Sequence, residues 1–541
     1  MIRHLNKSIP IPLPMAGVIA LVIVYSVLGL TGHSPWKTED AIGIGIVHEM
    51  LTGTGWTHWL VPHLAGEPYL SDGPLFYWVS TLCAKLFAFA LPVHDAARVA
   101  SALFLGVTIW FARLAAVQFF GRQEGDSAAL MLIGCLGLFA HAHMVDGENG
   151  ALAGAAIGWY GLSLSMRGRI SGAGYLAGGI TLILWAKGIT PTIPLLVAAV
   201  VAPLLVEQCR SRRFAGTIAV AALLFGIALL AWISVLAAAM QGGVDTWWAL
   251  QTNSFAMPDL DRTREQMQLL SWATWPLWPI AIWSLWERRR RLRSDPSLIV
   301  VTGAVAAFGL FMANRNVSEI VAEPMMIPLA LLAGSGFTTL RRGAAHAISW
   351  FGALTFTILG GLVWLGWVAM MIGIPQQIAA NFEKLEPGHI PRFDTLTFAM
   401  AAMLTMAWAA LLIRGNRSPL KGAPIWACGV TLIWGLTMSL WIRWIDYGKT
   451  YQPMAQSLMA ALPANHGCIA SRNLGEAQRA AIHYHAGIVT RRLETRAGSE
   501  CRSLLIQGSA SRPDNVSPEW RQIWQGSRPR ERERFRLYVR G

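Results

Sequence analysis

The segment HSPWKTEDAIGIGIVHEMLTGTGWTHWLVPHLAGEPYLSDGPLFYW, residues 33–78, decides how this chain is interpreted. It follows the first long apolar stretch and begins with two adjacent acids, Glu39 and Asp40, before a helix-length run that ends at Leu51. Tryptophans and prolines follow, and Asp72 opens a second apolar run. Carboxylates in an aromatic loop directly outside a bilayer indicate chemistry at the membrane surface, because a transporter would sooner place its acids inside a span.

The composition is that of a polytopic membrane protein. Of the 541 residues, 54% are hydrophobic and only 14% are charged, and the mean hydropathy is +0.44. The net charge of +14 is spread over loops and the C-terminal region, which argues for the positive-inside rule and against a nucleic-acid partner. The first apolar segment is too long for a cleaved signal peptide. The six cysteines lack metal-binding spacing, so we expect no zinc site.

Hydropathy predicts thirteen membrane-spanning helices, and Lys and Arg set their orientation. Basic residues before the first span place the N-terminus in the cytoplasm and residues 32–95 outside as an extended periplasmic loop. The apolar run at residues 73–91 is expected to be interfacial or re-entrant, because a crossing there would move the basic cluster at residues 287–293 outside. The spans fall near residues 12–31, 96–119, 126–143, 148–166, 172–187, 190–207, 214–240, 268–286, 297–313, 320–340, 346–372, 395–413 and 423–444.

The chain divides into two expected domains. Residues 1–445 form the transmembrane part, and residues 446–541 lose the long apolar runs and form a small soluble domain on the periplasmic side. Short apolar stretches beginning at Cys468 and Leu504 predict buried strands, and residues 475–486 predict a helix, which together indicate an α/β unit.

Acids and a base recur at the outer ends of three spans. Besides the Glu39 and Asp40 pair, these are the Asp146-Gly-Glu148 turn, which could present both carboxylates to one cation such as Mg²⁺ or Mn²⁺, and Lys187 at the end of a helix. We expect the acids to be exposed in loops. Solvated turns, and for Lys187 interfacial snorkelling, are the alternative explanations of these residues taken singly.

The order of these features resembles the GT-C glycosyltransferases of family 39, which include lipid A aminoarabinose transferases and protein O-mannosyltransferases. The matching motifs are the first acid pair, Glu-Met at residues 49–50, PHLAGEPY at residues 62–69, GPLFYW at residues 73–78, Asp146, Lys-Gly at residues 187–188 and PMMIPLALL at residues 324–332. The resemblance covers the first 340 residues well and the C-terminal region only in its position. It implies a multi-pass protein of the bacterial inner membrane.

The resemblance implies transfer of a hexosyl or pentosyl group from a polyprenyl-phosphate donor to a lipid, glycan or protein acceptor in the cell envelope. Glu39, Asp40 and Asp146 are then the candidate catalytic acids. Asp146 and Glu148 are the candidate ligands for a divalent metal, although no cofactor is required. A hydroxyl acceptor needs one carboxylate base, and a cation must stabilise the leaving phosphate.

Two departures from the family pattern affect the site. The acids occur in the order Glu39, Asp40 instead of Asp, Glu, so either one could be the base. Asp72 replaces a lysine that the resemblance assigns to the lipid phosphate. The cations available to bind the phosphate in its place are Lys187, Arg262, Arg264 and Arg315.

Aromatic side chains of the first loop complete the candidate substrate site. Trp56 could stack on a sugar or hold the prenyl chain, and Asp72 and Tyr77 flank the same loop. An interfacial tryptophan belt is the favoured explanation of Trp56. A transporter or flippase of lipid-linked substrates, and an inactive family member that acts in assembly, remain the alternatives. The sequence names neither the sugar nor the acceptor.

Cys468 and Cys501 are expected to form a disulfide, because both lie in the polar C-terminal region that the topology sends to an oxidising compartment. The bond would stabilise a domain that is too small for a large core. Two buried thiols are the alternative. The other four cysteines, in or beside apolar helices, are expected to act as small hydrophobic residues.

Overall fold

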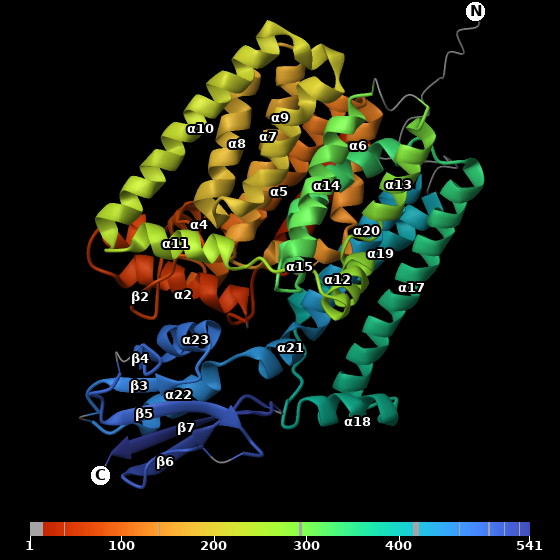
Figure 1. Cartoon of the computed structure of the whole chain (residues 1–541). Helices are drawn as coiled ribbons and strands as arrows, with labels where there is room; N and C mark the ends of the chain where they lie inside the picture. The colour runs from red at the N-terminus through yellow and green to blue at the C-terminus, as the bar shows by residue number, and fades with distance from the viewer. Residues whose placement is uncertain are drawn as a thin grey trace, which may run out of the picture.

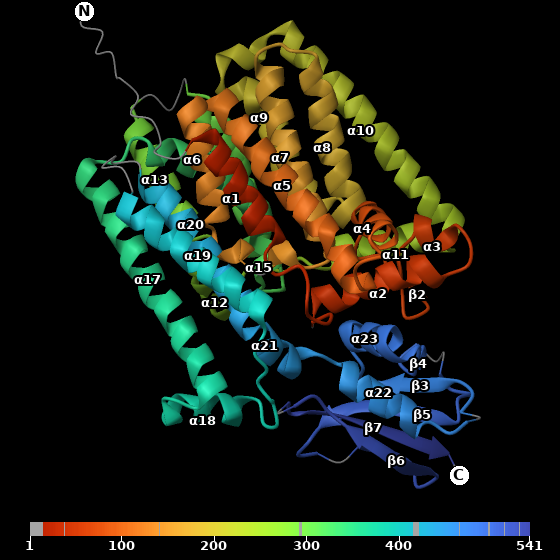
Figure 2. The same ribbon diagram turned by 180° about the vertical axis from the view of Figure 1, so that it is seen from behind.

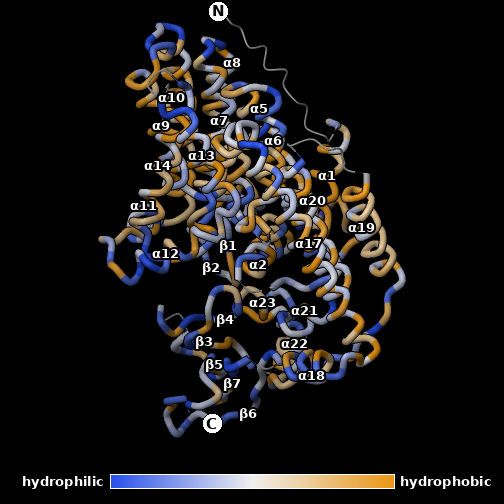
Figure 3. Tube along the Cα trace, turned by 90° about the vertical axis from the view of Figure 1, so that its right-hand side faces the viewer, coloured by the Kyte–Doolittle hydropathy of each residue, from blue (hydrophilic) through white to orange (hydrophobic). Residues whose placement is uncertain are grey.

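The computed structural model describes residues 14–36, 38–139, 141–290, 295–414, 421–464, 466–495, 498–512, 514–529 and 531–540. Long helices form one bundle, and a small sheet lies beyond one end of it (Figures 1 and 2). Hydrophobic segments fill the bundle, while hydrophilic segments gather in loops and in the sheet region (Figure 3). Residues 291–294 of the expected basic cluster, and the basic residues that precede the first span, lie outside the described residues.

The first half of the chain supplies the N-terminal helices of the bundle and the loop elements at one of its ends. Its elements are α1 (Met15–Val27), α2 (Glu39–Thr52), α3 (Thr57–Leu60), β1 (His63–Leu64), β2 (Glu67–Pro68), α4 (Leu75–Leu86), α5 (Val93–Phe119), α6 (Arg122–Ile133), α7 (Gly147–Met166), α8 (Ser171–Lys187), α9 (Ile193–Leu205) and α10 (Arg212–Ala239).

The second half of the bundle packs around α16 and α20. Its elements are α11 (Gly243–Thr252), α12 (Leu260–Ala273), α13 (Leu277–Arg288), α14 (Ser297–Ala313), α15 (Glu319–Ala322), α16 (Met326–Phe337), α17 (Arg342–Ile372), α18 (Gln376–Leu385), α19 (Thr395–Arg414), α20 (Gly422–Leu436) and α21 (Ile442–Lys449). One large apolar core joins α5, α6, α7, α16 and α20, and α10 and α19 leave most of their apolar side chains exposed, as lipid-facing helices do.

Each of the thirteen expected spans coincides with helix in the described part of the chain. Six helical segments there are long and apolar enough to cross a membrane, or seven if the bent pair at residues 122–143 counts as one span. The span expected at residues 268–286 is divided instead between α12 and α13. Pro276 lies at the break, and a proline cannot donate the backbone hydrogen bond that would continue a helix.

Helix α4 has only 12 residues. At 1.5 Å per residue it is roughly 18 Å long, which is shorter than the ~30 Å hydrocarbon core of a bilayer. It lies with α2 and α3 at the end of the bundle that faces the C-terminal sheet (Figure 2). A helix of this length fits an interfacial or re-entrant position. Length alone does not distinguish it from α1 and α9, which have 13 residues each and lie at expected spans.

The C-terminal region is a five-stranded sheet with two helices. Its elements are α22 (Gln452–Ala461), β3 (Ile469–Arg472), α23 (Glu476–Ala486), β4 (Thr490–Arg492), β5 (Ser503–Ser509), β6 (Trp520–Gly526) and β7 (Glu533–Arg540), in the strand order β4-β3-β5-β7-β6. Strand β3 is parallel to β4 and β5, and β7 is antiparallel to β5 and β6. The two expected strands and the expected helix are confirmed, and the boundary expected at residue 446 falls within α21.

A disulfide joins Cys468 and Cys501, 33 residues apart, as the sequence predicts. The bond ties the residue before β3 to the segment just before β5. The remaining cysteines are free, and Cys83, Cys135 and Cys209 are buried.

Candidate functional site

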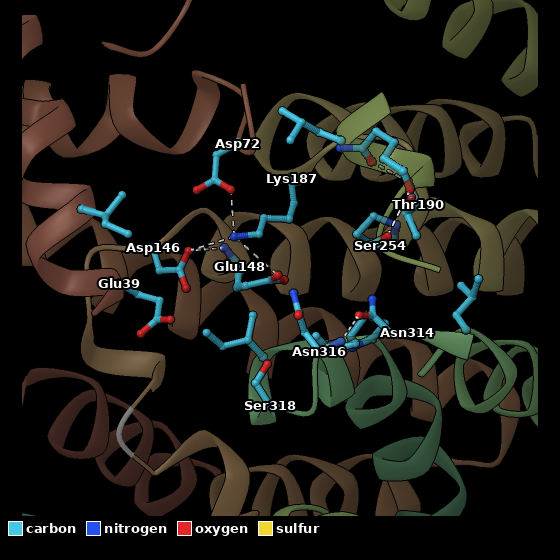
Figure 4. A pocket seen from close by; sticks show the side chains of 18 of the residues that line it. Glu39, Asp72, Asp146, Glu148, Lys187, Thr190, Ser254, Asn314, Asn316 and Ser318 are labelled. Carbon is cyan, nitrogen blue, oxygen red and sulfur yellow. Dashed lines mark hydrogen bonds and ion pairs between the residues drawn. The ribbon is translucent and has the colours of Figure 1, made fainter. Parts of the chain in front are cut away.

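Lys187 lies at the centre of a cluster of carboxylates. Its Nζ is 2.8 Å from Asp72 Oδ1, 3.4 Å from Asp146 Oδ1 and 3.7 Å from Glu148 Oε1. Figure 4 shows the lysine side chain reaching between these acids. All three carboxylates are buried, whereas a fifth of the lysine side chain remains accessible. The ammonium group is therefore neutralised by acids that come from two separate parts of the chain.

The backbone of the first loop brings Asp72 to this position. The Gly73 N–H donates to the Ala186 carbonyl at 3.0 Å, and a Cβ added at Gly73 would lie 2.1 Å from the Trp185 carbonyl oxygen. Only glycine permits so close an approach. Asp146 is the N-cap of α7, where its side chain accepts from the Glu148 N–H at 3.3 Å. The acid-x-acid turn thus becomes a helix start that faces the end of α8.

Asp72 and Asp146 differ in the hydrogen bonds that their carboxylate oxygens accept. The Tyr77 hydroxyl donates to Asp72 Oδ2 at 2.6 Å. Burial raises the pKa of Asp72 above its ordinary value, and Asp146 adds to this, while Lys187 works in the opposite direction. Asp146 Oδ2, by contrast, is buried and has no hydrogen-bond partner among the described residues. Asp72 Oδ1 also has no hydrogen bond in this part of the chain, but it lies 2.8 Å from the Lys187 ammonium, so Asp146 Oδ2 is the oxygen of these two carboxylates with neither kind of contact.

The cluster lines a cavity of about 320 Å³. The opposite wall carries uncharged polar side chains, which are Thr190, Gln251, Ser254, Asn314, Asn316 and Ser318 (Figure 4). Two loops are joined to make this wall, because the Arg315 N–H donates to the Ser254 carbonyl at 2.7 Å and Phe255 pairs with Asn314. One side of the cavity is therefore charged, and the other offers amides and hydroxyls.

Glu39 and Asp40 have separate positions. Glu39 is half-buried and lines the cavity. Asp40 is 1% exposed and does not line it; its Oδ2 is 2.7 Å from Arg98 Nη2, and its Oδ1 accepts from the Val145 N–H at 3.0 Å. The expectation that the acids are exposed in loops is wrong for Asp40, because α2 turns it inward against a buried arginine. Glu39 is the acid of the pair that faces the site. The expectation is also wrong for Asp146 and Glu148, which are buried beside Lys187.

The arginines named as phosphate ligands lie outside the acid cluster. Arg315 is exposed, and its Nε donates to the Phe255 carbonyl at 3.0 Å beside the cavity wall. Arg262 donates to the Met257 carbonyl from the start of α12, and Arg264 is exposed on the same helix. Trp56 is 81% exposed and does not line the cavity. Of the predicted cations, only Lys187 touches the carboxylates.

The cluster does not fit a divalent metal. Asp146 and Glu148 share their space with Asp72, but the Lys187 ammonium lies within 4 Å of all three and takes the place a cation would fill. In the described residues, no group of three or more His, Cys, Asp or Glu side chains has a geometry that could hold a metal ion.

Sequence reasoning missed the uncharged wall and Tyr69, which also lines the cavity. Polar amide and hydroxyl residues at the end of an apolar span are common, so Asn314 and Ser318 carry a weak signal when each is taken alone. Their position at the same end of the bundle as Lys187 was the only available indication.

Comparison with known proteins gives two kinds of match. No protein-family model matches the chain. It is 27% identical over 124 residues to undecaprenyl phosphate-alpha-4-amino-4-deoxy-L-arabinose arabinosyl transferase 1 of Pseudomonas fluorescens (strain Pf0-1), which is 23% of this chain and 21% of that protein. It is 28% identical over 171 residues to arabinosyl transferase 2 of Sodalis glossinidius (strain morsitans), which is 31% of this chain and 30% of that protein. The matched segments thus span less than a third of these relatives.

Among solved structures, the crystal structure of ArnT from Cupriavidus metallidurans bound to undecaprenyl phosphate is similar over 96% of both chains, with a TM-score of 0.66 and 15% identity. The chain has the ArnT fold. The apo structure of the same protein gives a TM-score of 0.64 over the same share of both chains. The likeness in fold extends over nearly the whole chain, including the C-terminal region that the sequence resemblance matched only in position.

Proposed function

We propose that this protein is a glycosyltransferase that moves a pentosyl or hexosyl group from a polyprenyl-phosphate donor to an acceptor at the periplasmic face of the bacterial inner membrane. The observation that carries the proposal is the cavity in which Lys187 meets Asp72, Asp146 and Glu148 at one end of the bundle. The ArnT fold and the partial sequence matches to two arabinosyl transferases support the same reaction class.

The chemistry is a direct displacement at the anomeric carbon. The acceptor oxygen forms a bond to this carbon while the bond to the phosphate oxygen breaks, and the electron pair leaves with the phosphate. With a hydroxyl acceptor, a carboxylate takes the proton as the new bond forms. Asp146 Oδ2 is the strongest candidate for this base, because it is buried at the cavity and unpartnered, and Glu39 is the second.

The charges on the two sides of the cavity indicate which part of the substrate each side binds. Glu39, Asp72, Asp146 and Glu148 outnumber Lys187, so the cluster suits the sugar and the acceptor hydroxyl better than a second anion. The amide and hydroxyl wall can donate to the phosphate oxygens, and Arg315 beside it can neutralise their charge. Lys187 then lies between the two sides, where it stabilises the negative charge that develops on the leaving oxygen.

The acceptor class stays open between a lipid such as lipid A, another glycan and a protein. An ionised phosphate acceptor would need no base. A hydroxyl acceptor would depend on Asp146, and this difference separates the acceptor chemistries experimentally.

Transfer by the purified protein in detergent tests the proposal. Labelled polyprenyl-phosphate sugar is incubated with the protein and with extracted envelope lipids and glycans, and the labelled product is identified by mass spectrometry. Asp146→Asn should lower the rate by about 10²–10⁴-fold, the usual contribution of a general base. Arg536→Met, whose change lies in the C-terminal sheet, serves as the unaffected control.

Two other outcomes have distinct meanings. Movement of labelled lipid across proteoliposomes without transfer would favour the transporter alternative. Absence of both activities, together with loss of an envelope modification in a deletion strain, would favour the assembly alternative.

A further inference from the structure

The β1–β2 hairpin of the first loop has a strained tip. Ala65 has a φ of +48° and Gly66 a φ of +78°, so both turn residues adopt the left-handed conformation that a two-residue hairpin requires. Glycine adopts this conformation without penalty, but alanine does not. A non-glycine residue stays in this conformation only where its surroundings hold it there.

Arg479, on α23 of the C-terminal region, holds this tip. The side chain is 2% exposed, and its Nη1 is 3.0 Å from Glu67 Oε2 while its Nη2 donates to the Ala65 carbonyl at 3.3 Å. The same guanidinium is fixed within its own region, because it donates to the Thr490 carbonyl at 2.9 Å and to the Thr490 hydroxyl at 3.2 Å. From the other side, Glu49 accepts from the Gly66 N–H at 2.8 Å.

The hairpin leads directly into the cavity. Its closing bond runs from the Tyr69 N–H to the Pro62 carbonyl at 2.7 Å, and Tyr69 lines the cavity. Three residues later Asp72 meets Lys187 at 2.8 Å. A displacement of the hairpin therefore moves the carboxylate that neutralises the lysine.

The C-terminal helix and the first loop also share one apolar core. Ala480 of α23 is completely buried together with Leu64 of β1 and Val47 of α2. A Cβ added at Gly45 of α2 would lie 2.8 Å from the Ala480 Cβ, so the two helices are in direct contact. In Figures 1 and 2, α23 lies beneath α2 and the hairpin.

We infer that Arg479 is a positioning residue for the transferase cavity, which it reaches through the Ala65–Gly66 turn and not through contact with substrate. The C-terminal region is then a structural part of the catalytic site, not a separate sensor. This inference rests on the proposed function for its effect on turnover, but the effect on the hairpin is independent of it.

The first experiment compares Arg479→Met with Arg479→Lys and with Arg536→Met. Arg536 is a matched control, because it is 8% exposed and pairs with Asp514 at 3.0 Å inside the same sheet without touching the first loop. Arg492 lies 2.5 Å from Glu67 in the wild type and is unchanged in all three variants, so we expect the carboxylate to keep a partner. Arg479→Met should lower kcat roughly 10- to 100-fold, as a small displacement of reacting groups does, with KM for the donor changed less than about threefold. The kcat of Arg479→Lys should lie between the kcat of wild type and that of Arg479→Met.

A suppressor variant separates positioning from general stability. Ala65→Gly relieves the left-handed strain, so Arg479→Met combined with Ala65→Gly should recover roughly fivefold or more of the lost kcat. Ala65→Gly alone should keep the wild-type kcat within about twofold. Absence of recovery, or an equal loss in Arg536→Met, would overturn the inference.

Hydrogen exchange gives a readout without substrate. Amides of residues 63–70 should exchange faster in Arg479→Met than in wild type, and at the wild-type rate in Arg536→Met. If the wild-type protein transfers no sugar, the proposed function fails, while this comparison still decides whether Arg479 holds the hairpin. If the amides of residues 63–70 exchange at the wild-type rate in Arg479→Met, Arg479 does not hold the hairpin, even if sugar transfer is observed.

Discussion

Adjacent acids in the sequence have opposite roles at the scale of single residues. Consecutive positions of a helix point in directions about 100° apart, so Glu39 and Asp40 at the start of α2 face different surroundings. Burial works to raise the pKa of Asp40, but Arg98 outweighs it and keeps this pKa below its ordinary value. Asp40 thus serves the fold by neutralising a completely buried arginine.

Replacing the two acids by amides should separate these roles. Asp40→Asn leaves Arg98 with Asp95, 2.9 Å away, as its remaining carboxylate partner, so we expect a loss of about 3 kcal/mol, the low end for breaking a buried pair. Glu39→Gln should alter stability by less than about 0.5 kcal/mol and lower turnover instead. Apparent melting temperatures in detergent and transfer rates measure both effects. An unchanged melting temperature in Asp40→Asn would contradict the assignment.

The same ion pair predicts acid sensitivity. Because the folded pKa of Asp40 lies below its unfolded value, its stabilisation is fully present above the unfolded pKa of about 3.9 and is lost as pH falls through the folded value. Melting temperature measured against pH should therefore fall more steeply below about pH 4 in wild type than in Asp40→Asn. Parallel curves would exclude Asp40 as the source.

The protonation of Asp72 should determine how kcat falls at acidic pH. Since burial raises its pKa, the carboxyl takes up its proton at a higher pH than an exposed aspartate and then releases its ion pair with Lys187. Wild-type kcat should decrease on the acidic side as pH falls through this raised pKa, and Asp72→Asn should have a lower kcat with a flatter acidic limb. An acidic limb of the same midpoint in Asp72→Asn would assign it to another group.

At the scale of elements, the C-terminal sheet depends on a covalent link. The Cys468–Cys501 bond closes a loop of 33 residues between the segments that precede β3 and β5, two parallel neighbours in the sheet. Such a closure lowers the conformational entropy of the unfolded chain, and this stabilisation matters most in a domain that is too small for a large core.

Removal of the disulfide should destabilise this region by roughly 3–4 kcal/mol on the chain-entropy model. The measurement is thermal unfolding of Cys468→Ser/Cys501→Ser, with Cys209→Ser as a control for a cysteine that is free. Non-reducing mass spectrometry of wild type should give a linked peptide that contains both residues. Quantitative alkylation of both thiols without reductant would refute the bond and weaken the periplasmic placement of the region.

At the scale of the whole molecule, polarity is arranged along the bundle axis. The first-loop helices α2 and α3 and the C-terminal sheet lie at one end of the bundle (Figures 1 and 2). Lys187, the last residue of α8, contacts Asp72 of the first loop, so the cavity lies at the same end. Because cytoplasmic loops of membrane proteins are enriched in Lys and Arg, the basic residues of the opposite loops predict that those loops are cytoplasmic.

Reporter fusions test this orientation. A fusion in the loop between α13 and α14, at Arg293, should read cytoplasmic, and one after Gly541 should read periplasmic. The opposite reading at either position would mean that residues 73–91 cross the membrane, and the cavity would then face the cytoplasm or be divided by the bilayer.

The sequence alone predicts the long apolar helices, two of the five strands of the C-terminal sheet, the helix at residues 475–486 and the disulfide. Lipid cannot satisfy backbone hydrogen bonds, so every long apolar stretch must become a helix, and local composition suffices to find it. Tertiary packing places Glu39 at the cavity and Asp40 away from it, pairs Asp72 with Lys187, and joins Asn314 and Ser254 in one wall. These contacts join residues more than fifty positions apart, and their geometry follows from backbone approaches such as that of Gly73 to α8, which leave no periodic trace in the sequence.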